Sequence, residues 1–198
     1  MTTLLLLGVV MGTVMTGTFS ANNAVMGASL RLENLDQART LMASLTKDVR
    51  TAVHLSAGTS PFIVADANHA TFYANLSTTG APKKVDLAID SQSRLIEKVW
   101  NADAGSSAPN YTYTGAATVR LVGRYLANSA AAPLFTYLDD TGDALPNTPL
   151  NATDLLAVNA VQIELVVKKN VATPLNATTL LNTVRLPNLD YDNDVSGS

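Results

Sequence analysis

Residues 1–30 carry no ionisable side chain, and Arg31 is the first in the chain. The residues from Thr3 to Phe19 are apolar apart from small glycines and threonines. A membrane-spanning helix needs about 20 mostly apolar residues, and the stretch from Leu4 to Met26 supplies that length. The pattern therefore predicts a hydrophobic helix over residues 1–30, buried by a membrane or by neighbouring helices in an assembly. The residues of this helix predicted to lie in the membrane or in the core of an assembly are Leu4, Leu5, Leu6, Leu7, Gly8, Val9, Val10, Met11, Gly12, Val14, Met15 and Phe19.

The same apolar stretch is open to a second interpretation, as a cleavable signal peptide with its cleavage site before Ala21. A signal peptide begins with a basic region, and no basic residue precedes this apolar run. The residues after Ser20 also continue a helical pattern instead of starting a separate domain. The pattern therefore favours a retained helix over a removed one.

From Arg31 onward the apolar residues recur at the three- and four-residue spacing of an amphipathic helix. No proline interrupts the chain before Pro61, and the first stop signal is the segment from Ser56 to Gly58. We therefore expect residues 31–57 to continue the first helix to about residue 55, roughly 80 Å in all. The side chains predicted to pack on a sheet are Leu35, Leu41, Met42, Leu45, Val49 and Val53, with Leu32, Ala38 and Ala52 on the same face. The opposite, charged face is predicted to carry Arg31, Glu33, Asp36, Arg39, Lys47, Asp48 and Arg50.

After Gly58 the pattern changes to alternating and β-branched runs, which indicate strands. A short helical turn is expected at 154–157, capped by Thr153 or Asp154. Residues 160–168 form the clearest strand, with Val161, Ile163, Leu165 and Val167 on one face. The predicted fold class is therefore α+β, in which the long N-terminal helix covers one face of an antiparallel sheet formed by residues 58–198. The expected strands are 62–64, 70–76, 84–89, 94–100, 118–123, 134–138, 160–168 and 178–186, followed by a polar tail from Asp190.

Composition narrows the possible functions. Only 15% of the 198 residues are charged, against roughly 25% in typical soluble proteins. The net charge of −3 and the scattered basic residues give no sign of a nucleic-acid partner. The chain has no cysteine, which excludes disulfides, thiolate metal sites and cysteine nucleophiles.

Candidate chemistry is sparse. His54 and His69 lack the spacing of a two-histidine metal site, and no nucleophile-elbow or phosphate-loop motif occurs. His54 is expected near a helix end, where a cation suits the helix dipole. We expect no cofactor and no enzymatic activity. Two sets of surface candidates are weak: calcium ligands at Asp139, Asp140 and Asp143, for which a solvated turn is favoured, and glycosylation sequons at Asn75, Asn110, Asn151 and Asn176.

The order of an apolar helix, an amphipathic helix and a sheet resembles type IV pilins and pseudopilins over essentially the whole chain. The segments 134–142, 155–167 and 183–189 resemble the aromatic strand with its Asp/Gly turn, the next strand and the ending of minor pilins. The family's Gly cleavage site and Phe-Thr-Leu-x-Glu start are not found, since the chain opens Met1-Thr2-Thr3-Leu4-Leu5. If Gly8 is the family's recurrent glycine, that motif is expected a few residues before Met1. The other interpretation is a pilin that matures with an N-terminal Met and lacks the Glu, so cleavage, N-methylation and the family's Glu salt bridge are left open.

The resemblance implies a structural subunit of a type IV pilus-like extracellular filament, assembled through the hydrophobic helix. Its partners would be copies of itself or other pilins in a helical filament. It implies insertion in the cytoplasmic (inner) membrane first, and then a place in a filament on the cell surface. Adhesion, motility, secretion and DNA uptake all remain open as roles. The alternatives are a signal-anchored extracytoplasmic binding domain that does not polymerise, and a secreted enzyme with a mature N-terminus at Ala21.

Overall fold

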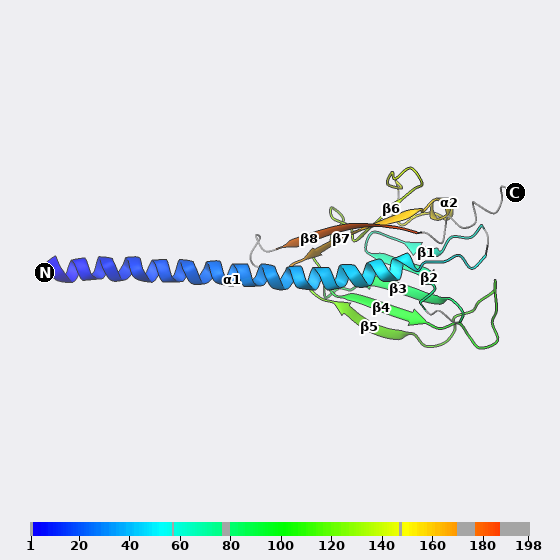
Figure 1. Ribbon diagram of the computed structural model, residues 1–198, viewed down its shortest axis with the longest axis horizontal. Coiled ribbons are helices and arrows are strands. Elements are labelled where there is room, and N and C mark those ends of the chain that lie inside the picture. The colour runs from blue at the N-terminus through cyan, green and yellow to red at the C-terminus, as the bar shows by residue number, and fades with distance from the viewer. Residues whose placement is uncertain (1, 57, 77–79, 147, 170–176, 187–198) are drawn as a thin grey trace.

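The computed structural model describes residues 2–56, 58–76, 80–146, 148–169 and 177–186, without the side chains of residues 2–7, 9 and 10. One long helix, α1 (Thr2–Arg50), leads into a globular region built from two antiparallel sheets and a short helix (Figure 1). The first half of α1 projects from this region, while its second half packs on it. The α+β class predicted from the sequence is therefore confirmed.

The first sheet is a five-stranded meander in the order β1-β2-β3-β4-β5. Every neighbouring pair in it is antiparallel. Alternation along β2 turns Ala70, Phe72 and Ala74 into the core and His69 and Thr71 toward the outer face. The five strands are β1 (Phe62–Ala65), β2 (His69–Ala74), β3 (Lys83–Ile89), β4 (Leu95–Trp100) and β5 (Thr118–Gly123).

The second sheet has the order β6-β7-β8 and is also antiparallel. It is formed by β6 (Phe135–Leu138), β7 (Ala160–Val167) and β8 (Thr178–Arg185), with α2 (Ala152–Leu156) between β6 and β7 in sequence. The face predicted for β7 is confirmed, because the side chains of Val161, Ile163, Leu165 and Val167 are all buried. The sequence had predicted a single sheet, whereas the strands divide into two.

The second half of α1 joins the two sheets through one core. It contacts β7 and β8 of the smaller sheet and β5 at the edge of the larger one. Gly123, at the end of β5, lies so close to the helix that a Cβ there would fall 2.3 Å from Leu41 Cδ2. The fully buried apolar residues of α1 are spaced three or four apart and are Ala38, Leu41, Leu45 and Val49; Ala52, just past the end of the helix, is buried too.

Most of the predicted packing positions lie in this core, with some differences in degree. Leu41, Leu45 and Val49 are fully buried, while Leu35, Met42 and Val53 are half-buried. The neighbouring Leu32 is 67% exposed, because at 100° per residue it lies on the side of the helix opposite to Ala38 and Leu45. Asp48, predicted on the charged outer face, is buried, and so is Asn34.

Helix α1 ends at Arg50, earlier than the predicted residue 55. The chain leaves the helix because the end of β2 offers it strand-like hydrogen bonds. Val53 N donates to Tyr73 O at 2.9 Å, and Asn75 N donates to Thr51 O at 2.8 Å. The helix therefore ends without the glycine that often follows a helix C-terminus. Pairing with β2 supplies hydrogen-bond partners for the backbone groups that no longer bond within the helix.

Helix α2 begins two positions before the predicted turn. Its N-cap is Asn151, whose side chain accepts hydrogen bonds from the backbone N–H groups of Thr153 and Asp154. The cap was predicted at Thr153 or Asp154. Asparagine is as good an N-cap as aspartate, so composition alone could not decide between them.

The expected insertion in the cytoplasmic (inner) membrane, and with it the predicted location on the cell surface, is overturned. Among the described residues, no helix combines the length and the apolar character needed to cross a membrane. The sequence prediction rested on the mostly apolar stretch from Leu4 to Met26, in which glycine and threonine were taken as tolerated. From Met11 to Leu30 the helix contains threonines, serines, glycines and the pair Asn22-Asn23, which lower its mean hydropathy.

Candidate assembly surface

Residues 11–30 of α1, the projecting segment, extend away from the globular region (Figure 1), and large apolar side chains are exposed along this segment. Met11 is 71% exposed and Phe19 is 59% exposed. Side chains of this size usually find cover in folded proteins, and a contiguous exposed set indicates an interaction site. We name six of them the large face, formed by Met11, Val14, Met15, Phe19, Val25 and Met26.

Two hydroxyl groups on the projecting segment, those of Thr16 and Thr18, are compatible with burial. Thr16 Oγ1 donates to Gly12 O at 2.7 Å, and Thr18 Oγ1 donates to Val14 O at 2.9 Å. These hydroxyls donate to carbonyl groups of their own helix. A neighbouring molecule that covered them would therefore not need to supply a hydrogen-bond partner for either donor. Gly12 and Thr18 also border a shallow, open and almost wholly apolar hollow between Met11, Met15 and Phe19.

The helix is fixed to the globular region where the projecting segment begins. Gln37 Nε2 donates to Arg124 O at 2.8 Å, and Lys169 N donates to the buried Asn34 Oδ1 at 3.2 Å. Lys169 also forms an ion pair with Glu33. These contacts from two loops hold the base of the projecting segment, so that the segment has a defined direction relative to the sheets.

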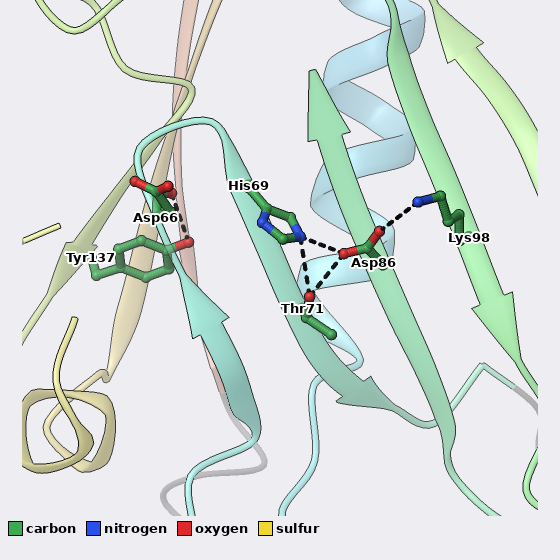
Figure 2. Close-up of polar contacts among 6 residues, drawn as sticks. All are labelled: Asp66, His69, Thr71, Asp86, Lys98 and Tyr137. Atoms are coloured by element: carbon green, nitrogen blue, oxygen red, sulfur yellow. Dashed lines mark hydrogen bonds and ion pairs between the residues drawn. The ribbon is translucent and has the colours of Figure 1, made fainter. Parts of the chain in front are cut away.

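A second candidate is the polar cluster on the outer face of the larger sheet (Figure 2). Cross-strand pairing places Thr71 of β2 and Lys98 of β4 on either side of Asp86 of β3. Thr71 Oγ1 donates to Asp86 Oδ1 at 2.8 Å, His69 Nε2 lies 2.5 Å from the same oxygen, and Lys98 Nζ lies 3.6 Å from Asp86 Oδ2. All these neighbours are donors directed at one carboxylate.

The chemistry of this cluster is that of a structural ion pair. Burial by itself would raise the pKa of Asp86, but the hydrogen bonds from His69 and Thr71, with the charge of Lys98, lower it below its usual value. The Asp86 carboxylate is therefore held in its ionised form by the groups around it. Nearby, Tyr137 donates to Asp66 O at 3.2 Å, and burial raises the pKa of this phenol. The cluster therefore ties β2, β3 and β4 together.

A third cluster lies between α1 and the larger sheet, and the sequence did not predict it. Arg120 Nε of β5 donates to Glu97 Oε2 of β4 at 2.6 Å, and Arg120 Nη2 lies 3.8 Å from Asp48 Oδ2 of α1. Burial, followed by the charge of Glu97, raises the pKa of Asp48 to about 6. One guanidinium thus faces two buried acids. Counting turns at 100° per residue would have placed Asp48 beside Leu41 on the buried side.

The remaining predicted site residues do not converge on a site. The Asp139 carboxylate accepts hydrogen bonds from Thr141 and from Asp143 N, which lower its pKa and close the turn that was favoured over calcium binding. Over the described ranges, Asp139, Asp140 and Asp143 do not form a group that could hold a metal ion. His54 lies past the end of α1, beside Thr59 O.

The sequons differ in their availability. Asn75 and Asn110 are exposed, whereas Asn176 lies outside the described residues. Asn151 is exposed too, but its Nδ2 donates to Asp154 Oδ2 at 2.8 Å while its Oδ1 caps α2. Its side-chain amide therefore has a structural role in the folded protein.

Comparison with known proteins adds no family to this picture. No protein-family model matches the chain, and no curated protein sequence matches it. The class of protein that the fold defines is α+β, with a projecting N-terminal helix on two antiparallel sheets. The likeness to type IV pilins remains an expectation that rests on the order of the sequence segments.

Proposed function

We propose that this chain is the structural subunit of a type IV pilin-like filament, assembled through the projecting segment of α1 with copies of itself or with related subunits. The observation that carries the proposal is the large face, a row of exposed apolar side chains on a helix that leaves the globular region. Such a surface is stable in water only when other molecules cover it.

The magnitudes support assembly over a free monomer. Full burial of one such side chain contributes about 1.5–3 kcal/mol, so the large face offers on the order of 10 kcal/mol in total. Association costs about 4–15 kcal/mol in lost freedom. The gain and the cost are comparable, so that contacts with several neighbours, and not with one alone, make the assembly stable.

Deletion of residues 1–25 tests the proposal. The truncated chain keeps every fully buried residue of α1, the first of which is Asn34, so its globular region is expected to fold. We expect it to sediment as a monomer, while the full-length chain forms filaments visible by electron microscopy above a critical concentration. Filaments formed by the truncated chain would contradict the proposal.

A further inference from the structure

The large face occupies one side of the projecting segment. At 100° per residue, Met11, Val14, Met15, Phe19, Val25 and Met26 all fall within an arc of about 140°. The opposite side, between Thr13 and Ala28, carries no side chain larger than asparagine. Leu30 lies at the border between the two sides and is half-buried. We name the opposite side the small face, represented by Thr13, Thr16, Gly17, Ser20, Ala24 and Gly27.

The small face lies in line with the side of α1 that packs on the sheets. The same count of 100° per residue places Ser20 and Gly27 above Ala38, Leu45 and Val49, which are fully buried. The large face therefore points away from the subunit's own globular region. The projecting segment thus has two unlike surfaces, and the large face, whose arc also includes Thr18, Asn22 and Ser29, is not directed toward the rest of its own chain.

The available area decides how many neighbours the segment needs. The projecting part of α1, residues 2–30, forms a rod about 44 Å long and 10 Å wide, with a lateral surface of roughly 1,400 Å². One face supplies about half of this, whereas a stable specific interface buries about 800 Å² on each partner. Two copies that met through their large faces alone would fall somewhat short, and both small faces would remain uncovered. Contact through both faces of each helix removes this shortfall.

We propose that the large face of one copy packs against the small face of the next copy, and that this unlike pairing is the repeating contact of the filament. The inference rests on the proposed function and specifies its interface. Small side chains allow helix axes to approach to about 8 Å, so that the methionines and Phe19 fit against the backbone of the neighbour. Because residues 11–30 carry no charge, an uncharged partner such as a second copy leaves no ion unpaired.

This pairing determines the type of assembly. When two unlike surfaces meet, each copy keeps one free large face and one free small face, so the contact can continue from copy to copy. A contact between two large faces would instead be self-complementary and would end at a dimer. The arrangement of side chains around α1 therefore favours an open filament over a closed pair.

Cysteine cross-linking tests the pairing directly. The chain contains no cysteine, so each introduced thiol is the only one present. Met11→Cys, Met15→Cys and Met26→Cys mark the large face; Thr16→Cys, Ser20→Cys and Ala24→Cys mark the small face. Each full-length variant is assembled alone, and each large-face variant is also co-assembled with each small-face variant. A short bismaleimide is then added, and covalent dimers are measured on denaturing gels.

We expect covalent dimers from at least one mixture of a large-face with a small-face variant, and few from any variant alone. Filaments whose single variants cross-link as well as the mixtures do, or in which no mixture cross-links, would overturn the pairing while leaving the proposed function intact. An unmodified chain that forms no filaments would instead remove the proposed function, and the pairing with it. The two failures are therefore distinguishable.

A second set of variants tests the requirement for small side chains. Ser20→Leu and Ala24→Leu place a large group where the neighbour must approach, so the critical concentration for assembly should rise about tenfold or more. Ser91→Leu, the same change in the exposed turn between β3 and β4, should leave it unchanged. Assembly of the Ser20→Leu and Ala24→Leu variants at the normal concentration would overturn the inference.

Discussion

Single residues fix how α1 lies on the sheets, and Asp48 is the most informative. Its carboxyl is buried between α1 and the larger sheet, beside Glu97 and Arg120. It was predicted on the outer face because charged residues are mostly exposed. The three- and four-residue spacing of apolar positions located the buried side of α1 correctly. It could not show that Arg120, 72 positions later in sequence, would lie beside Asp48.

The raised pKa of Asp48 leads to a pH dependence of stability. Its pKa is about 6 in the folded state against 3.8 for the unperturbed group, so the folded protein binds the proton more tightly. Tighter proton binding by Asp48 stabilises the folded state fully below pH 3.8, and this stabilisation is lost as the pH rises through about 6. We therefore expect the Asp48 contribution to unfolding free energy to be larger at pH 5 than at pH 7.5.

Urea unfolding of the chain lacking residues 1–25, compared with its Asp48→Asn variant, isolates this contribution, because both proteins contain the same histidines. The two stabilities should change differently between pH 5 and pH 7.5. The exposed Asp36→Asn change on the same helix is the matched control. Parallel pH profiles for the parent protein and the Asp48→Asn variant would contradict the burial of this carboxyl.

Gly123 defines the contact between α1 and β5. A Cβ at this position would lie 2.3 Å from Leu41 Cδ2, so Gly123→Ala should force the helix and the strand apart. The expected loss of stability is about 1–3 kcal/mol, as for other overpacked cores. Gly115→Ala is the control, because a Cβ there meets only Asp103 Oδ1 at 3.9 Å. Equal denaturation midpoints for the two variants would rule out the close helix–strand approach.

At the scale of elements, the sequence predicted most strands because their signal is local. Residues 160–168 alternate with a period of two, and β7 (Ala160–Val167) has the buried face that this period requires. The division into two sheets was not predicted, since it depends on which strands pair across long stretches of chain. The early end of α1 has the same origin, because Val53 bonds to Tyr73 O.

The projecting segment shows what charge patterning can and cannot predict. The absence of ionisable residues before Arg31 correctly indicated an unusual helix, and exposed large side chains were found there. It did not indicate a membrane span among the described residues, because threonine, glycine and asparagine interrupt the apolar side chains. The two-faced arrangement required a count of turns in addition to composition.

A single charge on the large face should prevent assembly without affecting the fold. Met15 is 62% exposed in the projecting segment, so Met15→Lys leaves the core of the globular region unchanged. In an assembly the same ammonium would be buried without a partner, which costs several kcal/mol. We expect no pelletable filaments and an unchanged thermal midpoint. Ser91→Lys is the control, and a filament-forming Met15→Lys variant would exclude the large face from the interface.

At the scale of the whole molecule, α1 has two roles in one continuous helix. Its second half completes the core of the two sheets, and its first half leaves that core with its large side chains uncovered (Figure 1). The contacts of Gln37 and Asn34 hold the base of the projecting segment, so copies can present it in the same direction. In the proposed filament the globular regions lie outside and the helices inside.

The most direct test of this account is a cryo-electron microscopy reconstruction of filaments grown from the purified full-length chain. We predict that residues 11–30 of α1 lie at the filament core, each surrounded by other copies, with the globular regions on the outside. Filaments held together by the sheets, with the large face of α1 open to solvent, would contradict the account. So would a full-length chain that stays monomeric at every concentration tested.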